Sequence, residues 1–284
     1  MYSIWLMEYA RVERQPISSV LSGQHNKGYR ELAFTYALLV GGGHTILIDT
    51  GTDGDSQRTK EMHERDGVGL WQPPEKVLAK VGVKPGDVDT VLITHAHYDH
   101  MDNLRAFANA RFIAQEKEIL GWAWAMSREK RFRLPNMALK PDDIHEALHL
   151  VEEGRMRLVD GEVRDVLPGI DLYPAYDGHT FASQIVAVRA GEDALAFVGD
   201  VAYVRENIHG IGGDGVYVPV GLAVGTPFNQ MKHFDDIVRI VKGRMENIVI
   251  GHETDNWALY PSRKYEDGLH VAEIRLAQGD RSRI

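Results

Sequence analysis

The stretch Thr94-His95-Ala96-His97-Tyr98-Asp99-His100 holds four possible metal ligands within six consecutive residues. It follows the strongly apolar run Val91-Leu92-Ile93, which predicts a short buried strand. The ligands therefore begin in the loop that leaves a strand. His95 and His97 alternate, so their side chains share a face wherever the loop is extended. Because imidazole and carboxylate suit Zn²⁺, Mn²⁺, iron or Co²⁺, the stretch predicts a metal site and not an exposed His-rich loop.

Three more candidate ligands follow other predicted strands, each directly after a glycine. They lie in Gly178-His179, Gly199-Asp200 and Gly251-His252. Glycine allows close or unusual backbone geometry next to a ligand. Each of these residues is a weak signal alone, but four strand-end positions in one chain predict a single metal centre.

Composition limits the classes of protein that the chain can belong to. With 284 residues, 44% apolar and 26% charged, it is typical of a globular protein. The net charge of −9 disfavours nucleic acid and anionic membranes as partners. The absence of cysteine excludes disulfides and Cys-ligated zinc, so histidine and carboxylate must hold any metal. There is no apolar run long enough for a membrane span and no secretory signal in residues 1–21, so we expect a cytoplasmic protein.

Apolar patterning predicts a mixture of strands and helices in one domain over residues 1–284. Strands are predicted at residues 2–9, 34–40, 45–49, 91–93, 111–114, 156–160, 170–173, 183–188, 194–198 and 247–250, and helices at 55–66, 73–82 and 230–245. Residues 10–32 are polar and mixed, which predicts a long loop. Residues 119–150 combine tryptophan, methionine and basic residues and predict an inserted helical hairpin. Its aromatic side chains either pack on the core or form a lid over a pocket.

The complete pattern resembles the metallo-β-lactamase superfamily, through the motif H-x-H-x-D-H followed by separated His, Asp and His. The resemblance runs from about Phe34 to His252 and includes Asp49-Thr50-Gly51. It implies an α/β fold, the αββα sandwich, with the site at one edge of two sheets and a helical insert. It also implies two divalent ions, zinc first and Mn, Fe or Co as alternatives. The implied ligands are His95, His97 and His179 for one ion, Asp99, His100 and His252 for the other, and Asp200 as the bridge.

Asp49 ends a predicted strand and matches the acid that the family places at a strand end near its site. Such an acid is either a loop cap or a partner that orients a metal-bound histidine. The sequence leaves both interpretations open.

Tyr203 lies three residues after Asp200, which is similar to the Asp-x-x-Tyr of N-acyl-homoserine lactonases, whose tyrosine hydrogen-bonds the substrate carbonyl. The resemblance implies a hydrolase that opens a lactone, such as an acyl-homoserine lactone, by attack of a metal-bridging hydroxide. Tyr203 would stabilise the oxyanion, and Asp99 would carry a proton to the leaving alkoxide. The segments His100–His179 and Asp200–His252 are longer than in those lactonases, so the substrate stays open.

Other functions are compatible with the same ligands. A thioesterase resembling glyoxalase II would favour a basic C-terminal patch, for which Arg263, Lys264 and Arg275 are too scattered to decide. A mononuclear iron dioxygenase of the same superfamily is a further alternative, whereas the net charge disfavours a nuclease. The expected partner is a small ester or lactone, and the oligomeric state, a dimer included, is undetermined.

Residues 145–149, His-Glu-Ala-Leu-His, match the zinc-protease signature H-E-x-x-H. The signature lies in a charged insert, and no third ligand follows at a suitable spacing. We therefore expect His145 and His149 to be ordinary surface residues.

Overall fold

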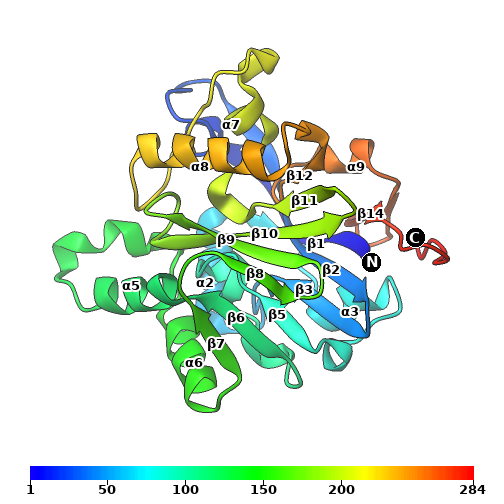
Figure 1. The fold of residues 1–284 in the computed structure, drawn as a ribbon. Helices are drawn as coiled ribbons and strands as arrows, with labels where there is room; N and C mark the ends of the chain where they lie inside the picture. The colour runs from blue at the N-terminus through cyan, green and yellow to red at the C-terminus, as the bar shows by residue number, and fades with distance from the viewer.

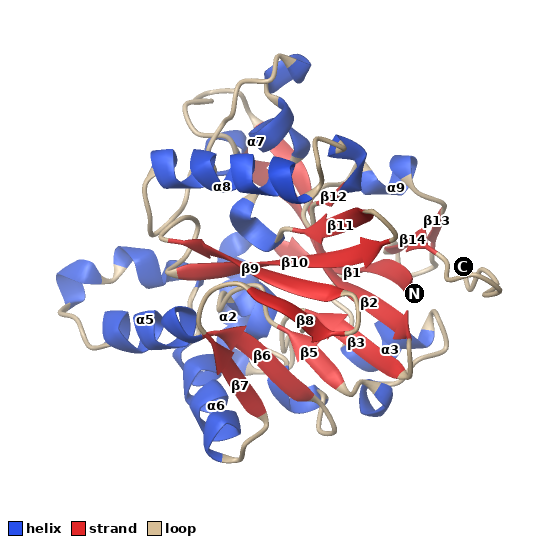
Figure 2. Ribbon diagram, in the orientation of Figure 1, coloured by secondary structure: helices blue, strands red, loops and turns tan.

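The computed structural model describes residues 1–284 and contains two β-sheets packed face to face, with helices on both outer faces (Figures 1 and 2). The expected αββα sandwich is confirmed. The first sheet has the strand order β13-β14-β1-β2-β3-β5-β6-β7, with β4 paired to β1, and the second has the order β12-β11-β10-β9-β8.

The bounds of the elements are as follows. The first sheet is built from Ser3–Pro16 (β1), Tyr29–Gly41 (β2), His44–Ile48 (β3), Val68–Gly69 (β4), Thr90–Leu92 (β5), Arg111–Gln115 (β6), Met156–Val159 (β7), Ser262–Lys264 (β13) and His270–Arg275 (β14). The second is built from Val163–Leu167 (β8), Ile170–Tyr176 (β9), Ala182–Ala190 (β10), Asp193–Phe197 (β11) and Ile248–Val249 (β12). The α-helices are Ile17–Val20 (α1), Gln57–Asp66 (α2), Pro74–Ala79 (α3), Tyr98–Met101 (α4), Glu116–Met126 (α5), Pro141–Glu152 (α6), Arg205–His209 (α7), Pro227–Ile240 (α8) and Asn256–Leu259 (α9). The 3₁₀ helices are Pro85–Asp87 (η1), Leu104–Ala106 (η2), Lys130–Phe132 (η3), Leu134–Ala138 (η4), Gly199–Val201 (η5), Ile211–Gly213 (η6) and Met245–Asn247 (η7).

Local sequence sets the ends of the longer helices. Ser56 caps α2 by accepting a hydrogen bond from the backbone N of Thr59, and Gly67 ends the helix with a φ of 72°. Thr226 caps α8 in the same way, followed by Pro227 at the first helical position, where its missing N–H costs nothing.

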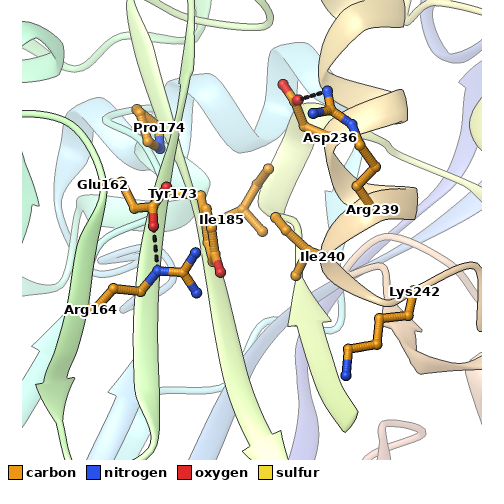
Figure 3. Close-up of a pocket in the computed structure, with 9 residues that line it drawn as sticks. All are labelled: Glu162, Arg164, Tyr173, Pro174, Ile185, Asp236, Arg239, Ile240 and Lys242. Carbon is orange, nitrogen blue, oxygen red and sulfur yellow. Dashed lines mark hydrogen bonds and ion pairs between the residues drawn. The ribbon is translucent and has the colours of Figure 1, made fainter. Parts of the chain in front are cut away.

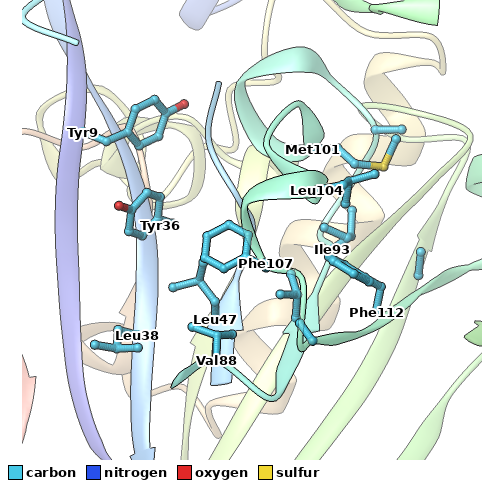
Figure 4. Close-up of a cluster of buried hydrophobic side chains, with 14 of the residues drawn as sticks. Tyr9, Tyr36, Leu38, Leu47, Val88, Ile93, Met101, Leu104, Phe107 and Phe112 are labelled. Atoms are coloured by element: carbon cyan, nitrogen blue, oxygen red, sulfur yellow. The ribbon is translucent and has the colours of Figure 1, made fainter. Parts of the chain in front are cut away.

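Both faces of the first sheet are apolar, and they fill two separate layers. Leu38 and Leu47 belong to the larger core beneath α3, α5 and α6, part of which is drawn in Figure 4. Their neighbours Leu39 and Ile46 belong to the layer between the two sheets. This alternation follows from the two-residue period of a strand. Continuously apolar strands are therefore required, because each is covered on both sides.

A third layer lies between the second sheet and α8. Phe234 and Ile237 of α8 pack against Ile185 of β10 and Ala196 of β11, and all four are fully buried. The three apolar layers give the order helix, sheet, sheet, helix.

The prediction of a loop over residues 10–32 was wrong except for residues 21–28. β1 continues to Pro16, β2 begins at Tyr29, and the short helix α1 lies between them. Charged residues in β1 suggested a loop, but they find partners inside the sheet. The Nε atom of Arg11 lies 2.6 Å from the Oε1 atom of Glu8, whose side chain is fully buried. Strands β4, β8, β13 and β14 were also not predicted.

Residues 119–150 form two helices, as the sequence predicted, with α5 and α6 packed against each other and the 3₁₀ helices η3 and η4 between them. The apolar side chains of this segment form a buried set and an exposed set. Trp122 is fully buried, whereas Trp124 is 57% exposed and Leu134 is 74% exposed. No helix in the chain has the length and apolar composition needed to cross a bilayer.

Phe107 tests the larger core, because its ring is fully buried among the side chains drawn in Figure 4. We expect Phe107→Ala to lower the free energy of unfolding by about 3–5 kcal/mol, since it removes packed apolar surface and leaves a cavity. Urea denaturation measures the change. The control Leu134→Ala, at an exposed position, should change it by less than about 0.5 kcal/mol. Equal effects of the two substitutions would contradict the assigned core.

Candidate metal centre

The predicted ligands converge because the strands before them end at one edge. β3 and β5 are parallel neighbours, with Ile48 paired to Leu92. In the second sheet, β11 and β12 are also parallel, with Phe197 paired to Val249. Adjacent parallel strands deliver the loops at their carboxyl ends to the same side of the sheet. Those loops carry the ligand candidates that follow β5, β11 and β12.

The structure brings all seven predicted ligands together in two groups that share one carboxylate. The ligand atoms within each group lie within 4.8 Å of one another. All seven side chains belong to buried residues. The first group is His95, His97, His179 and Asp200, and the second is Asp99, His100, Asp200 and His252.

Asp200 divides its two carboxylate oxygens between the groups. Its Oδ2 atom lies 3.5 Å from Nε2 of His95 and 3.4 Å from Nε2 of His179. Its Oδ1 atom lies 3.1 Å from Nε2 of both His100 and His252. A carboxylate in this position can bridge two ions, with one oxygen for each.

The spacing of the donor atoms matches the ligand sphere of a metal ion. Nδ1 of His97 lies 3.1 Å from Nε2 of His95 and 3.1 Å from Nε2 of His179. A tetrahedral ion with bonds of about 2.1 Å keeps its ligand atoms about 3.4 Å apart. In addition, Nε2 of His100 and Oδ1 of Asp200 are buried 3.1 Å apart without the geometry of a hydrogen bond. Buried polar atoms are normally paired, so this donor set fits a pair of divalent cations.

Asp49 performs both functions that the sequence left open. Its Oδ1 atom accepts a hydrogen bond from the backbone N of Thr94 at 2.7 Å, which ties the loop to β3. Its Oδ2 atom lies 2.8 Å from Nδ1 of His100 and accepts from the Thr94 hydroxyl at 2.8 Å. The second imidazole nitrogen of His100 is thereby fixed, and Nε2 is directed at the other donors.

Two backbone contacts hold other members of the second group. Nδ1 of His252 lies 2.7 Å from the carbonyl oxygen of Ala33 on β2. The hydroxyl of Tyr9, from β1, donates to the carbonyl oxygen of Asp99 at 2.5 Å. Sequence reasoning missed Tyr9 and Ala33, because these contacts join segments far apart in the chain.

The two groups differ in their protonation. Burial, followed by the neighbouring His95 and His179, holds the pKa of His97 well below its usual range. Burial also opposes protonation of His100, but the carboxylates of Asp200, Asp99 and Asp49 outweigh it and raise its pKa well above normal. The low pKa of His97 leaves its ring neutral for a metal ion, whereas the raised pKa of His100 means that a metal ion there must displace a proton. Binding at the second group should release protons and tighten as the pH rises.

A cavity of about 130 Å³ opens beside the two groups. The ring of Tyr203 borders it, 5.4 Å from the ring of His179 and 5.2 Å from that of His252. Asn207 fixes this position, because its Oδ1 atom accepts from the backbone N of Tyr203 at 2.9 Å. The other lining residues are Val12, Gln15, Leu32, Phe34, Arg65, Asp66, His97, Tyr98, Asp99, Met137, Ala138, Leu222 and His252.

Two features of the chain lie outside this centre. In the H-E-x-x-H sequence, His149 is exposed and Glu146 pairs with Arg105 at 2.6 Å, and neither joins the ligand groups. A larger cavity of about 520 Å³ lies between the second sheet and α8 (Figure 3). Four of its five charged side chains pair with each other, Arg164 with Glu162 and Arg239 with Asp236, and none of the seven ligand candidates lines it.

The chain belongs to the metallo-β-lactamase superfamily, because residues 31–252 match the model of that family. An N-acyl homoserine lactonase of Bacillus cereus is 25% identical over 171 residues, which cover 57% of this chain and 61% of that enzyme. The N-acyl homoserine lactonase AiiB of Agrobacterium fabrum is 24% identical over 229 residues, which cover 75% of this chain and 77% of that enzyme.

Solved structures show the same fold. An N-acyl homoserine lactone hydrolase with N-hexanoyl-L-homoserine bound at its catalytic metal centre superposes with a TM-score of 0.67 at 20% identity, covering 90% of this chain and 95% of the other. AidC, a dizinc quorum-quenching lactonase, gives a TM-score of 0.62 at 16% identity, covering 94% and 92%. At these identities the likeness establishes the fold.

Asp49→Asn tests how far the second group depends on its hydrogen-bonded partner. The amide oxygen replaces only one of the two carboxylate oxygens, so an N–H₂ group must face either the backbone N of Thr94 or the pair formed by the Thr94 hydroxyl and His100. We expect the affinity for Zn²⁺ to fall by about 10- to 100-fold, measured by competition with a chelating dye. Asp89→Asn is the control. Asp89 accepts a hydrogen bond from the backbone N of Thr45, which lies at the end of β3 away from Asp49. A larger loss in the control would contradict the role of Asp49.

Proposed function

We propose that this protein is a dinuclear metal-dependent hydrolase that opens a lactone, with an acyl-homoserine lactone as the first candidate. One observation carries the proposal: two complete donor groups share Asp200 and border the cavity that Tyr203 lines. The names of the relatives from Bacillus and Agrobacterium support the lactone. The presence of a second donor group, in addition to the three histidines, favours this function over a mononuclear iron dioxygenase.

The seven side chains His95, His97, Asp99, His100, His179, Asp200 and His252 would hold two divalent ions, with zinc as the proposed metal. Divalent ions at such a site lower the pKa of a water molecule to about 7 and polarise a carbonyl oxygen. The dizinc centre of AidC supports the choice of metal. The role of the chain is to fix both groups in a buried edge of the sandwich, so that the donors do not reorganise during the reaction.

Tyr203 is the proposed hydrogen-bond donor to the oxyanion that develops on the substrate carbonyl. Burial, followed by the carboxylates of Asp200 and Asp99, raises the pKa of Tyr203 well above its usual value. The phenol therefore keeps its proton at neutral pH and remains a donor. Asp99 lines the same cavity and is the proposed carrier of a proton to the leaving alkoxide, which stays tethered when the substrate is a lactone.

The walls of the cavity favour a neutral substrate with an apolar part. Val12, Leu32 and Phe34 form one wall, and Met137, from the segment between α5 and α6, contributes to the cavity as well. We therefore propose that this insert borders the substrate site and belongs to the single domain of residues 1–284.

A glutathione thioester is disfavoured by the charges at the cavity. The only arginine or lysine in its lining is Arg65, which pairs with Asp66 at 2.6 Å. A substrate with two carboxylates would need free cations there. Arg263, Lys264 and Arg275, which the sequence left undecided, do not line this cavity.

A hydrolysis screen of the zinc-loaded protein tests the proposal. It should include acyl-homoserine lactones, simple lactones, thioesters, β-lactams and phosphodiesters. We expect lactones to be the best substrates and a chelator to abolish their hydrolysis, with recovery on adding zinc. Preferential hydrolysis of a thioester or a phosphodiester would overturn the lactonase assignment.

Tyr203→Phe isolates the hydroxyl from the ring. We expect kcat for lactones to fall by about 100-fold, in the range measured when one oxyanion donor is removed, with two metal ions still bound. Tyr217→Phe is the matched control, because Tyr217 packs against Phe234 under α8 and does not line the cavity. Unchanged lactone turnover in Tyr203→Phe would remove the tyrosine from the mechanism.

A further inference from the structure

Glu118 is a buried acid that the proposed mechanism does not use. It lies in the first turn of α5, and the residue is only 1% exposed. No lysine or arginine pairs with it at salt-bridge distance. A buried carboxylate without a cation is costly unless hydrogen bonds compensate for its lost hydration, so its surroundings must supply them.

The carboxylate of Glu118 accepts hydrogen bonds from four donors. Its Oε1 atom accepts from the backbone N of Ala96 at 2.9 Å and from Nε1 of Trp122 at 2.8 Å. Its Oε2 atom accepts from the hydroxyl of Thr180 at 2.8 Å and from the backbone N of Ala182 at 2.7 Å. A carboxylate offers about four acceptor positions, and all of them are occupied here.

Three of these contacts join the two segments that carry the histidines of the first group. Ala96 stands between His95 and His97, and Thr180 follows His179 directly. Trp122, held by the same carboxylate, packs its ring 5.6 Å from the ring of His97. One side chain therefore connects the backbone on both sides of the group.

Two histidines of the first group, His97 and His179, have few other restraints, whereas Nδ1 of His95 lies 3.1 Å from the hydroxyl of Thr94. Nδ1 of His179 is buried and has no hydrogen-bond partner. The hydrogen-bond-distance contacts of His97 are to His95 and His179 alone. By contrast, His100 and His252 in the second group each have their Nδ1 atom fixed, by Asp49 and by the carbonyl of Ala33.

We propose that Glu118 is the positioning residue of the three-histidine site: it fixes the backbone around His97 and His179 in place of hydrogen bonds to their rings. The inference rests on the proposed metal centre and deepens it. It predicts that Glu118 acts mainly on the first group, whereas Asp49 holds His100 of the second group directly and reaches the first only through Thr94, whose hydroxyl lies 3.1 Å from Nδ1 of His95.

Glu118→Gln is the sharpest substitution, because it preserves size and removes one acceptor. The indole of Trp122 and the backbone N of Ala96 can only donate, whereas the hydroxyl of Thr180 can reverse and accept. The amide N–H₂ therefore turns toward Thr180 and leaves the backbone N of Ala182 without its acceptor. The link to the His179 segment is weakened, and the link to Ala96 survives.

The test measures metal affinity without any substrate, by Co²⁺ and Zn²⁺ competition against a chelating dye, in two backgrounds. His252→Ala removes a ligand from the second group. In this background we expect Glu118→Gln to lower the metal affinity of the first group by about 10- to 100-fold. His179→Ala removes a ligand from the first group. In this background we expect Glu118→Gln to change the metal affinity of the second group by less than about twofold. The visible absorption of bound Co²⁺ should shift only in the first background.

Two further variants control for charge and for folding. Glu116→Gln makes the same charge change in the same helical turn at an exposed position and should leave both affinities unchanged. Thr180→Val removes one donor and retains the carboxylate, and it should give a smaller loss in the His252→Ala background alone. It replaces Glu118→Gln if that variant does not fold, as judged by circular dichroism.

Equal losses of metal affinity in both backgrounds would show that Glu118 has a general structural role. No loss in either background would show that Glu118 does not position the histidines. Each of these results overturns the inference. A wild-type protein that binds two ions but hydrolyses no lactone would overturn the proposed function and leave this inference standing. A wild-type protein that binds no metal ion would overturn both.

Discussion

The rest of the structure depends on one constraint: five imidazoles and two carboxylates are buried together at the edge of the sandwich. Their donor atoms lie close to one another, and Asp200 is the only acid in the group of His95, His97 and His179. Burying such groups together is unfavourable, and the 3.1 Å contact between Nε2 of His100 and Oδ1 of Asp200 offsets only part of that cost. Divalent cations would resolve this conflict, and the apolar layers on either side provide the free energy that keeps the arrangement folded.

The fold supplies this centre through loops that are held by contacts with the strands and helices of the core. Parallel strands end beside it, and the contacts that orient its residues come from distant elements: Tyr9 from β1, Ala33 from β2 and Glu118 from α5. Because each contact ties a ligand-bearing segment to a strand or helix of the core, the positions of the donors are set when the sandwich forms. Such preorganisation is what a hydrolytic metal site requires.

Much of the centre could be predicted from the sequence, because local patterns carry it. His95 to His100 follow an apolar strand, and Asp49 stands at another strand end, where its contact with His100 was one of two expected roles. Glu118 could not be found this way. It lies beside the exposed Glu116 and Lys117, and nothing in a list of charged residues shows which one turns inward. The loop predicted at residues 10–32 failed for a similar reason, since the charge of Arg11 is paired inside the sheet with Glu8.

A crystal structure of the zinc-loaded protein, with anomalous difference maps recorded on both sides of the zinc absorption edge, tests the central claim most directly. The account predicts two peaks about 3.5–4 Å apart. One should lie among His95, His97 and His179, the other among Asp99, His100 and His252, with the carboxylate of Asp200 between them. A single peak, or zinc bound at the H-E-x-x-H sequence of α6 instead, would contradict it.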